Sequence, residues 1–191
     1  MSQFSAEGLS GWEEIVFAQK TDYRILDEED VSALCASSRS SASGWLKRVN
    51  VNLDEYPFLH WQWKVEKVIQ SGDETTREGD DYAARVYVIV DGGLFFWRTK
   101  ALNFVWASNK EKGSIWANAF AGQSAIMTAL RNNREDSTGV WQTEKVDLRT
   151  AFKKHFGGDF NRINAVAIMS DTDNTESVAE SCYGDIFFSS E

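Results

Sequence analysis

Proline, cysteine and histidine are scarce in this sequence: its 191 residues include one, two and two of them. With Pro57 alone, no proline-rich linker divides the chain, and we expect residues 1–191 to form a single domain of ordinary size. Cys35 and Cys182 belong to no Cys-x-x-Cys pair, which argues against a zinc or thioredoxin-type site. We expect both to be small core residues, and a bridge between them is the alternative if the first and last strands are neighbours.

Long apolar runs and basic clusters are also missing. The best apolar runs, residues 86–90 and 94–97, are far too short to span a bilayer, so membrane insertion is not expected. The net charge is −9, and no basic run exceeds Lys153-Lys154, which argues against a nucleic-acid surface. Residues 1–20 lack the basic start and apolar segment of a secretory signal. We therefore expect a protein that is intracellular or that begins after a removed leader.

Aromatic and β-branched residues are abundant, and they follow the spacing of strands. Residues 59–65 alternate apolar and polar positions, which predicts a strand with one buried face. Residues 83–90 and 101–107 are apolar on both faces except at Arg85 and Asn103, which is typical of central strands of a sandwich. We predict at least ten strands, at residues 14–17, 23–26, 31–35, 45–51, 59–65, 83–90, 101–107, 124–130, 140–146, 163–169 and 183–188.

One segment has helical spacing instead. Residues 147–157 carry apolar side chains three and four positions apart, with Asp147 placed as N-cap and Gly157 just past the C-terminus. Many short strands with one short helix, and no alternation of strands with helices, predict an all-β fold. We expect an antiparallel β-sandwich of jelly-roll type.

Polar residues inside apolar strands are the first candidates for a site. If Gln62, Lys64, Arg85, Tyr87 and Asn103 share one sheet face, they form a polar strip suited to a small polar ligand. Asp81 joins them as a ligand-binding candidate, and Trp97 and Trp116 are candidates for a flat platform beside the strip. The alternatives are a solvated face and, for the tryptophans, core packing.

Arg85 has two interpretations of its own. A buried guanidinium needs an anionic partner or several acceptors, so it either pairs with Asp81 or an acid of the 171–176 loop, or grips a ligand such as a pair of sugar hydroxyls.

A second constellation lies at residues 169–176, directly after an apolar strand. Asp171, Asp173 and Asn174 offer the oxygen ligands that Ca²⁺ prefers, although the turn glycine and distal glutamate of a helix-loop-helix calcium loop are missing. The alternative is an Asx-turn, in which these side chains bond their own backbone.

The sequence gives little sign of a catalytic nucleophile, since neither His60 nor His155 has an obvious Ser or Cys partner for a triad.

The sequence leaves three classes of function. The leading one is a non-catalytic binding module for a carbohydrate or other small polar ligand. The second is a hydrolase of envelope glycans that uses paired carboxylates from the set Asp80, Asp81, Asp171 and Asp173. The third is a structural or partner-binding protein, whose oligomeric state the sequence leaves open.

Short motifs cover nearly the whole chain in order, at residues 23–26, 41–44, 54–65, 79–81, 84–88, 101–106, 156–157, 169–175 and 183–186. This ordered set resembles the bacterial domain-of-unknown-function family numbered 3047. The resemblance implies one β-sandwich domain of galactose-binding-like jelly-roll type, with no established function. It also implies a periplasmic or secreted location, because members look like exported proteins. A binding role carried over from galactose-binding-like relatives is an analogy of fold, which names no ligand.

Overall fold

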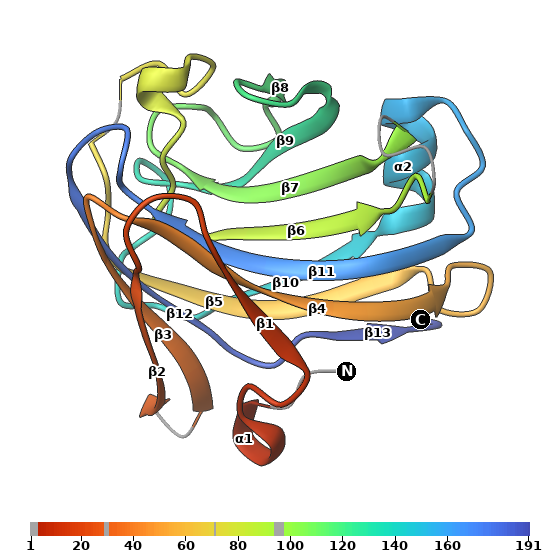
Figure 1. The fold of residues 1–191 in the computed structure, drawn as a ribbon, viewed down its shortest axis with the longest axis horizontal. Helices are drawn as coiled ribbons and strands as arrows, with labels where there is room; N and C mark the ends of the chain where they lie inside the picture. Colours follow the sequence, from red (N-terminus) through yellow and green to blue (C-terminus); the bar gives the residue numbers. More distant parts are fainter. Residues whose placement is uncertain (1–3, 29–30, 71, 94–97) are drawn as a thin grey trace.

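The computed structural model describes residues 4–28, 31–70, 72–93 and 98–191. The apolar run 94–97, with the platform candidate Trp97, lies outside them. The described residues form two β-sheets packed face to face, with a short helix at one end of the sandwich (Figure 1). The expectation of an all-β, jelly-roll sandwich is confirmed. No helix among the described residues is long and apolar enough to cross a membrane.

The first sheet has seven strands, and neighbouring strands in it are antiparallel except β7 and β9, which run parallel. In spatial order the strands are β1 (Trp12–Val16), β4 (Ala42–Asn52), β11 (Arg162–Asp171), β6 (Arg85–Val90), β7 (Lys100–Ala107), β9 (Gly122–Asn132) and β8 (Ile115–Asn118).

The second sheet has six strands. In spatial order these are β10 (Gln142–Asp147), β5 (Phe58–Lys67), β12 (Val178–Tyr183), β3 (Val31–Arg39) and β2 (Asp22–Glu28), and β13 (Phe187–Ser189) also pairs with β5. Among the described residues there are also two helices, α1 (Phe4–Glu7) and α2 (Leu148–Phe156), and a 3-10 turn at Arg77–Gly79.

Tryptophans fill the core between the sheets. Trp61 and Trp63 of β5 are fully buried, as their alternation with Gln62 and Lys64 predicts. Across the sandwich, the Trp61 ring lies 5.5 Å from the ring of Phe104, and Trp63 lies 6.3 Å from Trp106. Since β7 points these two residues into the core, its alternate residues must point to the outer face of the seven-stranded sheet.

The predicted helix is confirmed with both of its ends. The Asp147 side chain accepts a hydrogen bond of 2.9 Å from the Thr150 amide, and Gly157 adopts a left-handed φ of 72° at the C-terminus. Glycine accepts this conformation at no steric cost, which explains why the helix ends there.

Three expectations need correction. Cys35 and Cys182 lie directly opposite each other on β3 and β12 and form a disulfide, so the alternative of a bridge is the one observed. The predicted strand at 183–188 is interrupted at Gly184, where a side chain would collide with Gln62. Two strands were missed: β8, whose four residues are too few for alternation to stand out, and β12, which has few β-branched or aromatic residues and of which the prediction held only Tyr183.

Candidate functional site

The outer face of the seven-stranded sheet brings together three of the predicted site residues. Tyr87 lies opposite Asn103 across β6 and β7, and Arg85 lies two residues before Tyr87 on the same face. The row through Tyr87 crosses the sheet as Leu46, Ala167, Tyr87, Asn103, Met127 and Trp116. Trp116, the described member of the expected platform, therefore sits at the far end of this row.

Gln62 and Lys64 are not part of this face. Both lie on β5 in the other sheet, and Lys64 is buried with its Nζ 2.8 Å from Glu66 Oε1. The expected strip of five residues is therefore not formed. The physical reason is that alternation fixes the side of a strand on which a residue lies, whereas sheet membership depends on pairing between distant segments.

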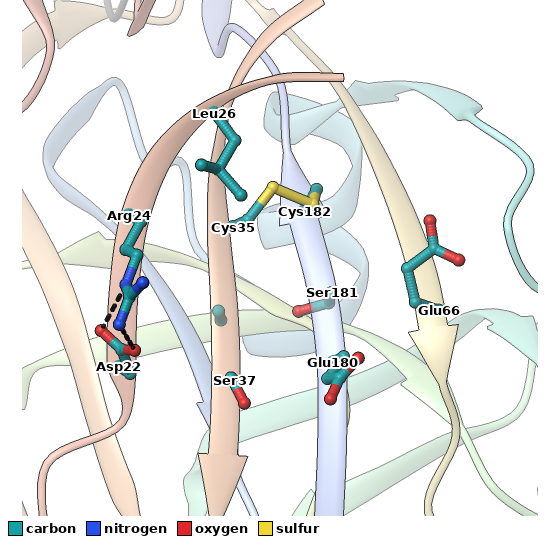
Figure 2. A pocket seen from close by; sticks show the side chains of 10 residues that line it. Asp22, Arg24, Leu26, Cys35, Ser37, Glu66, Glu180, Ser181 and Cys182 are labelled. Atoms are coloured by element: carbon teal, nitrogen blue, oxygen red, sulfur yellow. Dashed lines mark hydrogen bonds and ion pairs between the residues drawn. A yellow bond between two sulfur atoms is a disulfide. The ribbon is translucent and has the colours of Figure 1, made fainter. Parts of the chain in front are cut away.

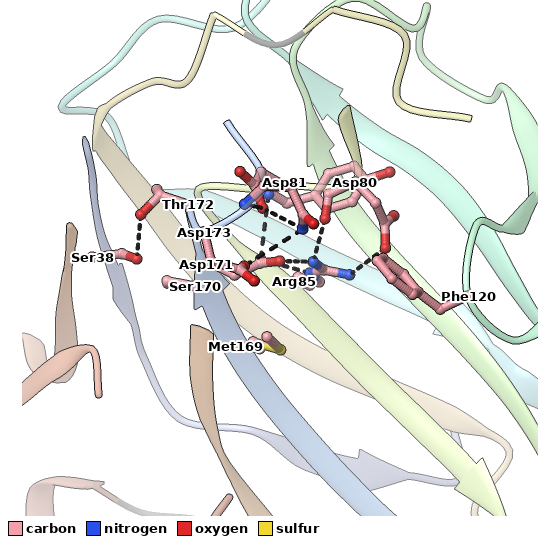
Figure 3. Close-up of polar contacts among 12 residues, drawn as sticks. Ser38, Asp80, Asp81, Arg85, Phe120, Met169, Ser170, Asp171, Thr172 and Asp173 are labelled. Carbon is pink, nitrogen blue, oxygen red and sulfur yellow. Dashed lines mark hydrogen bonds and ion pairs between the residues drawn. The ribbon is translucent and has the colours of Figure 1, made fainter. Parts of the chain in front are cut away.

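Arg85 is paired inside the protein. Its Nε donates to Asp171 Oδ1 at 2.8 Å, its Nη2 contacts Asp171 Oδ2 and donates to the Asp80 carbonyl at 2.9 Å, and the side chain is 4% exposed. The rings of Tyr82 and Tyr87 lie 4.5 and 5.9 Å from the guanidinium carbon. Figure 3 shows the acidic side chains gathered around the guanidinium. This arrangement matches the internal pairing with an acid of the 171–176 loop.

The carboxylates of Asp81, Asp171 and Asp173, here called the aspartate cluster, have oxygens within 4.8 Å of one another. Burial raises the pKa of Asp173, and the nearby Asp81 carboxylate raises it further. Such crowding of negative charge is what a hard cation such as Ca²⁺ relieves.

Protein donors already reach all three members of the aspartate cluster, although the contact from Asn174 to Asp173 is long, at 3.5 Å. Asp81 accepts hydrogen bonds from the backbone N–H of Thr175 at 2.7 Å, from its hydroxyl at 2.6 Å, and from the Asn174 side-chain nitrogen at 3.0 Å. Asp171 is bonded to Arg85. A calcium ion would therefore have to compete with Arg85 and with Thr175, and Asn174 would have to turn its amide oxygen toward the ion.

Asn103 differs from Arg85 in its bonding. It is 1% exposed, and its Oδ1 has no hydrogen-bond partner among the described residues. Leaving a buried acceptor unsatisfied costs about 1–3 kcal/mol. Asn103 is the cross-strand partner of Tyr87, whose hydroxyl makes a long contact of 3.5 Å to Met169 Sδ.

An apolar groove of about 180 Å³ lies on the same face, next to Tyr87. It crosses β1, β4, β11 and β6 and is lined by Ile15, Phe17, Leu46, Tyr87, Ile89 and Met169, among others. Sequence reasoning missed it, although Ile89 and Met169 share the face of Arg85 and Tyr87. The signal that could have found it is the accumulation of apolar side chains on a face that should otherwise be polar.

A second hollow, of about 310 Å³, lies on the outer face of the six-stranded sheet (Figure 2). The disulfide crosses it from β3 to β12, and Glu66, Glu180 and the exposed Asp22–Arg24 ion pair line its sides. None of the site residues predicted from the sequence lies there.

Similar solved structures share the sandwich. The xyloglucanase domain of NopAA, a type three effector from Sinorhizobium fredii solved in complex with cellobiose, matches with a TM-score of 0.52 at 12% identity, over 94% of this chain and 93% of that one. Endoglucanase cel12A from Rhodothermus marinus matches with a TM-score of 0.52 at 9% identity, over 94% and 91%. The family 11 carbohydrate-binding module from Clostridium thermocellum gives 0.48 at 9% identity, over 96% and 89%. At these identities the first two likenesses establish the fold alone.

Sequence comparison gives the family. No curated protein matches the chain. A family model described as "Protein of unknown function (DUF3047)" matches residues 10–187, which is nearly the full length and agrees with the ordered motifs described above. The chain therefore belongs to the DUF3047 family.

Proposed function

We propose that this domain is a non-catalytic binding module that holds a carbohydrate or another small polar ligand at Tyr87 and Asn103, on the outer face of the seven-stranded sheet. The observation that carries the proposal is the Asn103 Oδ1, a buried acceptor without a partner among the described residues. A ligand hydroxyl that donates a hydrogen bond to this oxygen would remove the free-energy cost of leaving it unsatisfied. That free energy, which lowers the stability of the unliganded fold, would then contribute to ligand affinity.

The neighbouring residues fit a sugar. The Tyr87 ring is partly buried and stands next to Asn103, so it offers an aromatic face beside an amide. Sites for small polar ligands combine a few oriented polar groups with apolar and aromatic walls, and this pairing meets that description. The solved structure of the NopAA domain, which shares the sandwich, was obtained with cellobiose.

Arg85 has a supporting role in this proposal. Its guanidinium is bonded to the Asp171 carboxylate and to the Asp80 carbonyl, so in this proposal it holds the start of β6 in place rather than contacting the ligand. Asp81 is likewise occupied by Thr175 and Asn174. The site then consists of Tyr87 and Asn103 with the adjoining groove.

A glycan hydrolase is the second candidate, and one observation favours it. Burial raises the pKa of Asp80, as a general acid requires. A glycosidase also needs a second carboxylate across the scissile bond, at about 5–10 Å from the first. Of the other candidate carboxylates, Asp171 is bonded to Arg85 and Asp81 to Thr175, and this favours binding over hydrolysis.

The disulfide supports a location outside the cytoplasm. Cys35 and Cys182 are bonded in this structure, and structural disulfides persist in oxidising compartments such as the periplasm. We therefore keep a periplasmic or secreted location as part of the proposal.

Isothermal titration with cellobiose, xyloglucan oligosaccharides and galactose-containing oligosaccharides tests the function. For an oligosaccharide that binds, Tyr87→Ala and Asn103→Leu should each weaken binding about tenfold or more, and Asn103→Leu should also raise the free energy of unfolding by about 1 kcal/mol. Gln62→Ala, an amide in the other sheet, is the matched control and should bind as the wild type does. Binding that survives in both site variants would overturn the proposal, as would a panel without any binder. Release of reducing sugar that Asp80→Asn abolishes would establish the hydrolase instead.

A further inference from the structure

The groove beside Tyr87 is almost entirely apolar. Its walls are Ile15 and Phe17 at the edge of the sheet, Leu46 on β4, Met169 on β11, and Tyr87 with Ile89 on β6. Sites that hold only sugar need polar groups for the hydroxyls, and among the lining side chains only Tyr87 and Trp45, whose indole nitrogen is buried, carry one. The groove is therefore built for a group that does not hydrogen-bond.

The rim of the groove is exposed to solvent. Phe17 is 69% exposed and Ile15 is 36% exposed. Apolar side chains that form a continuous exposed patch, rather than being scattered singly, indicate a surface that binds an apolar group.

The size of the groove limits what fits. Its volume of about 180 Å³ lies below the roughly 300–1,000 Å³ of pockets that enclose a whole drug-sized ligand. An apolar cavity of about 150 Å³ is enough for benzene. One aromatic ring or a short alkyl chain therefore fills the groove, and a peptide or an oligosaccharide does not.

The groove floor depends on one glycine. A side chain at Gly44 would lie 2.3 Å from the Ile168 carbonyl oxygen and 3.1 Å from the Met169 Cβ. Because Gly44 has no side chain, β4 and β11 can approach closely there. The groove then stays open between Ile15 and Met169, the cross-strand neighbours of Gly44.

We propose that the ligand is amphiphilic: a polar, sugar-like part at Asn103 carries an aryl or short alkyl group that fills the groove. Tyr87 joins the two parts, because it lines the groove and is also the cross-strand partner of Asn103. The inference rests on the proposed function for the polar part of the ligand, and it adds the class of its apolar substituent.

Methionine methyl groups distinguish the two parts of the site. The sequence has three methionines, Met1, Met127 and Met169. Met169 lines the groove, whereas Met127 is the cross-strand partner of Asn103. In a protein with ¹³C-labelled methionine methyl groups, Met169 therefore reports on the groove and Met127 on the polar part.

The probes are three glucosides with one sugar: octyl β-D-glucoside below its micellar concentration, phenyl β-D-glucoside and methyl β-D-glucoside. The octyl or the phenyl compound should shift the Met169 signal in a saturable way at concentrations at which the methyl compound does not. Comparison of the octyl and the phenyl glucoside shows whether the groove prefers an alkyl or an aryl group. If neither compound moves Met169, or if all three move it equally, the inference is overturned. The proposed function fails separately, when no oligosaccharide of the panel moves Met127.

Three variants test the location. Phe17→Ala removes an exposed wall of the groove, and Phe120→Ala removes a phenylalanine of comparable exposure, 55%, that does not line it. Ala167→Leu fills the groove from its floor. Affinity for the preferred probe should fall about tenfold in Phe17→Ala and in Ala167→Leu, and it should stay unchanged in Phe120→Ala. Equal losses in the two phenylalanine variants would contradict the assignment. A Met169 signal that shifts when the protein concentration is raised without any probe, together with a doubled mass in light scattering, would also contradict the assignment. A second copy of the chain would then occupy the groove.

Discussion

The Arg85–Asp171 pair gives the sharpest test of whether Arg85 supports the fold or the ligand. Both side chains are nearly fully buried, with exposures of 4% and 2%. Replacing one partner of such a pair leaves the other charge buried and unpaired, which costs about 3–5 kcal/mol. We therefore expect Arg85→Met to lower the free energy of unfolding by that amount. For a chain of this length, this corresponds to a fall in Tm of about 6–20 °C.

A double variant separates the cost of the unpaired charge from the loss of packing. In Arg85→Met with Asp171→Leu both charges are gone, and such replacements are often neutral or stabilising. Asp80 keeps part of the cost, because its carboxylate lies 3.7 Å from the guanidinium and loses that neighbour in both variants. The double variant should therefore be more stable than Arg85→Met alone, without fully reaching the wild type.

Urea unfolding measures all of these values, provided that the m-value stays constant. Arg24→Met is the matched control, since Arg24 forms the same kind of pair with Asp22 but with side chains 70% and 55% exposed. Exposed pairs contribute about 0–1 kcal/mol, so this variant should be nearly as stable as the wild type. The reasoning would be refuted if Arg85→Met also unfolded like the wild type. If that variant lost oligosaccharide binding as well, the guanidinium would be a ligand group.

Two further predictions concern the aspartate cluster and the disulfide. If calcium binds the cluster, Ca²⁺ at a hundred times its Kd should raise the free energy of unfolding by about 2.7 kcal/mol over the value in chelator. Equal unfolding curves in Ca²⁺ and in chelator would show that the hydrogen bonds of Arg85 and Thr175 to the aspartate cluster keep calcium from binding. Reduction of the Cys35–Cys182 disulfide should lower the free energy of unfolding by about 5 kcal/mol in the chain-entropy model, because the bridge closes a loop of 147 residues. Urea unfolding with and without reductant measures this, and a variant with both cysteines replaced by alanine should not respond to reductant.

Features that depend on neighbouring residues could be predicted from the sequence. The alternation at residues 59–65 gives the buried face of β5, and Asp147 and Gly157 mark the ends of α2. In each case a side chain and its structural consequence lie within a few residues, so local sterics and hydrogen bonding decide the outcome.

Features that depend on pairing between distant segments could not be predicted. Lys64 has the expected alternation, yet its strand joins the other sheet, beside β12 and β10. Cys35 and Cys182 are bonded only because β3 and β12 are neighbours in register. The partner of Arg85 is 86 residues away in the sequence. Each of these outcomes needs the strand order, which alternation does not contain.

Arg85 and Asn103 interrupt apolar strands in the same way, yet their chemistry makes them unequal signs of function. A buried charge without a partner costs far more than a neutral amide in the same position, so the fold must supply a partner for Arg85 whatever the protein binds. Asn103 is neutral, and the fold tolerates its unsatisfied oxygen at about 1–3 kcal/mol. A protein can retain the cost of a buried amide oxygen without a hydrogen bond where activity and stability make opposite demands. For this reason we place the ligand at Asn103, and the buried charge that first draws attention in the sequence anchors the strand beside it.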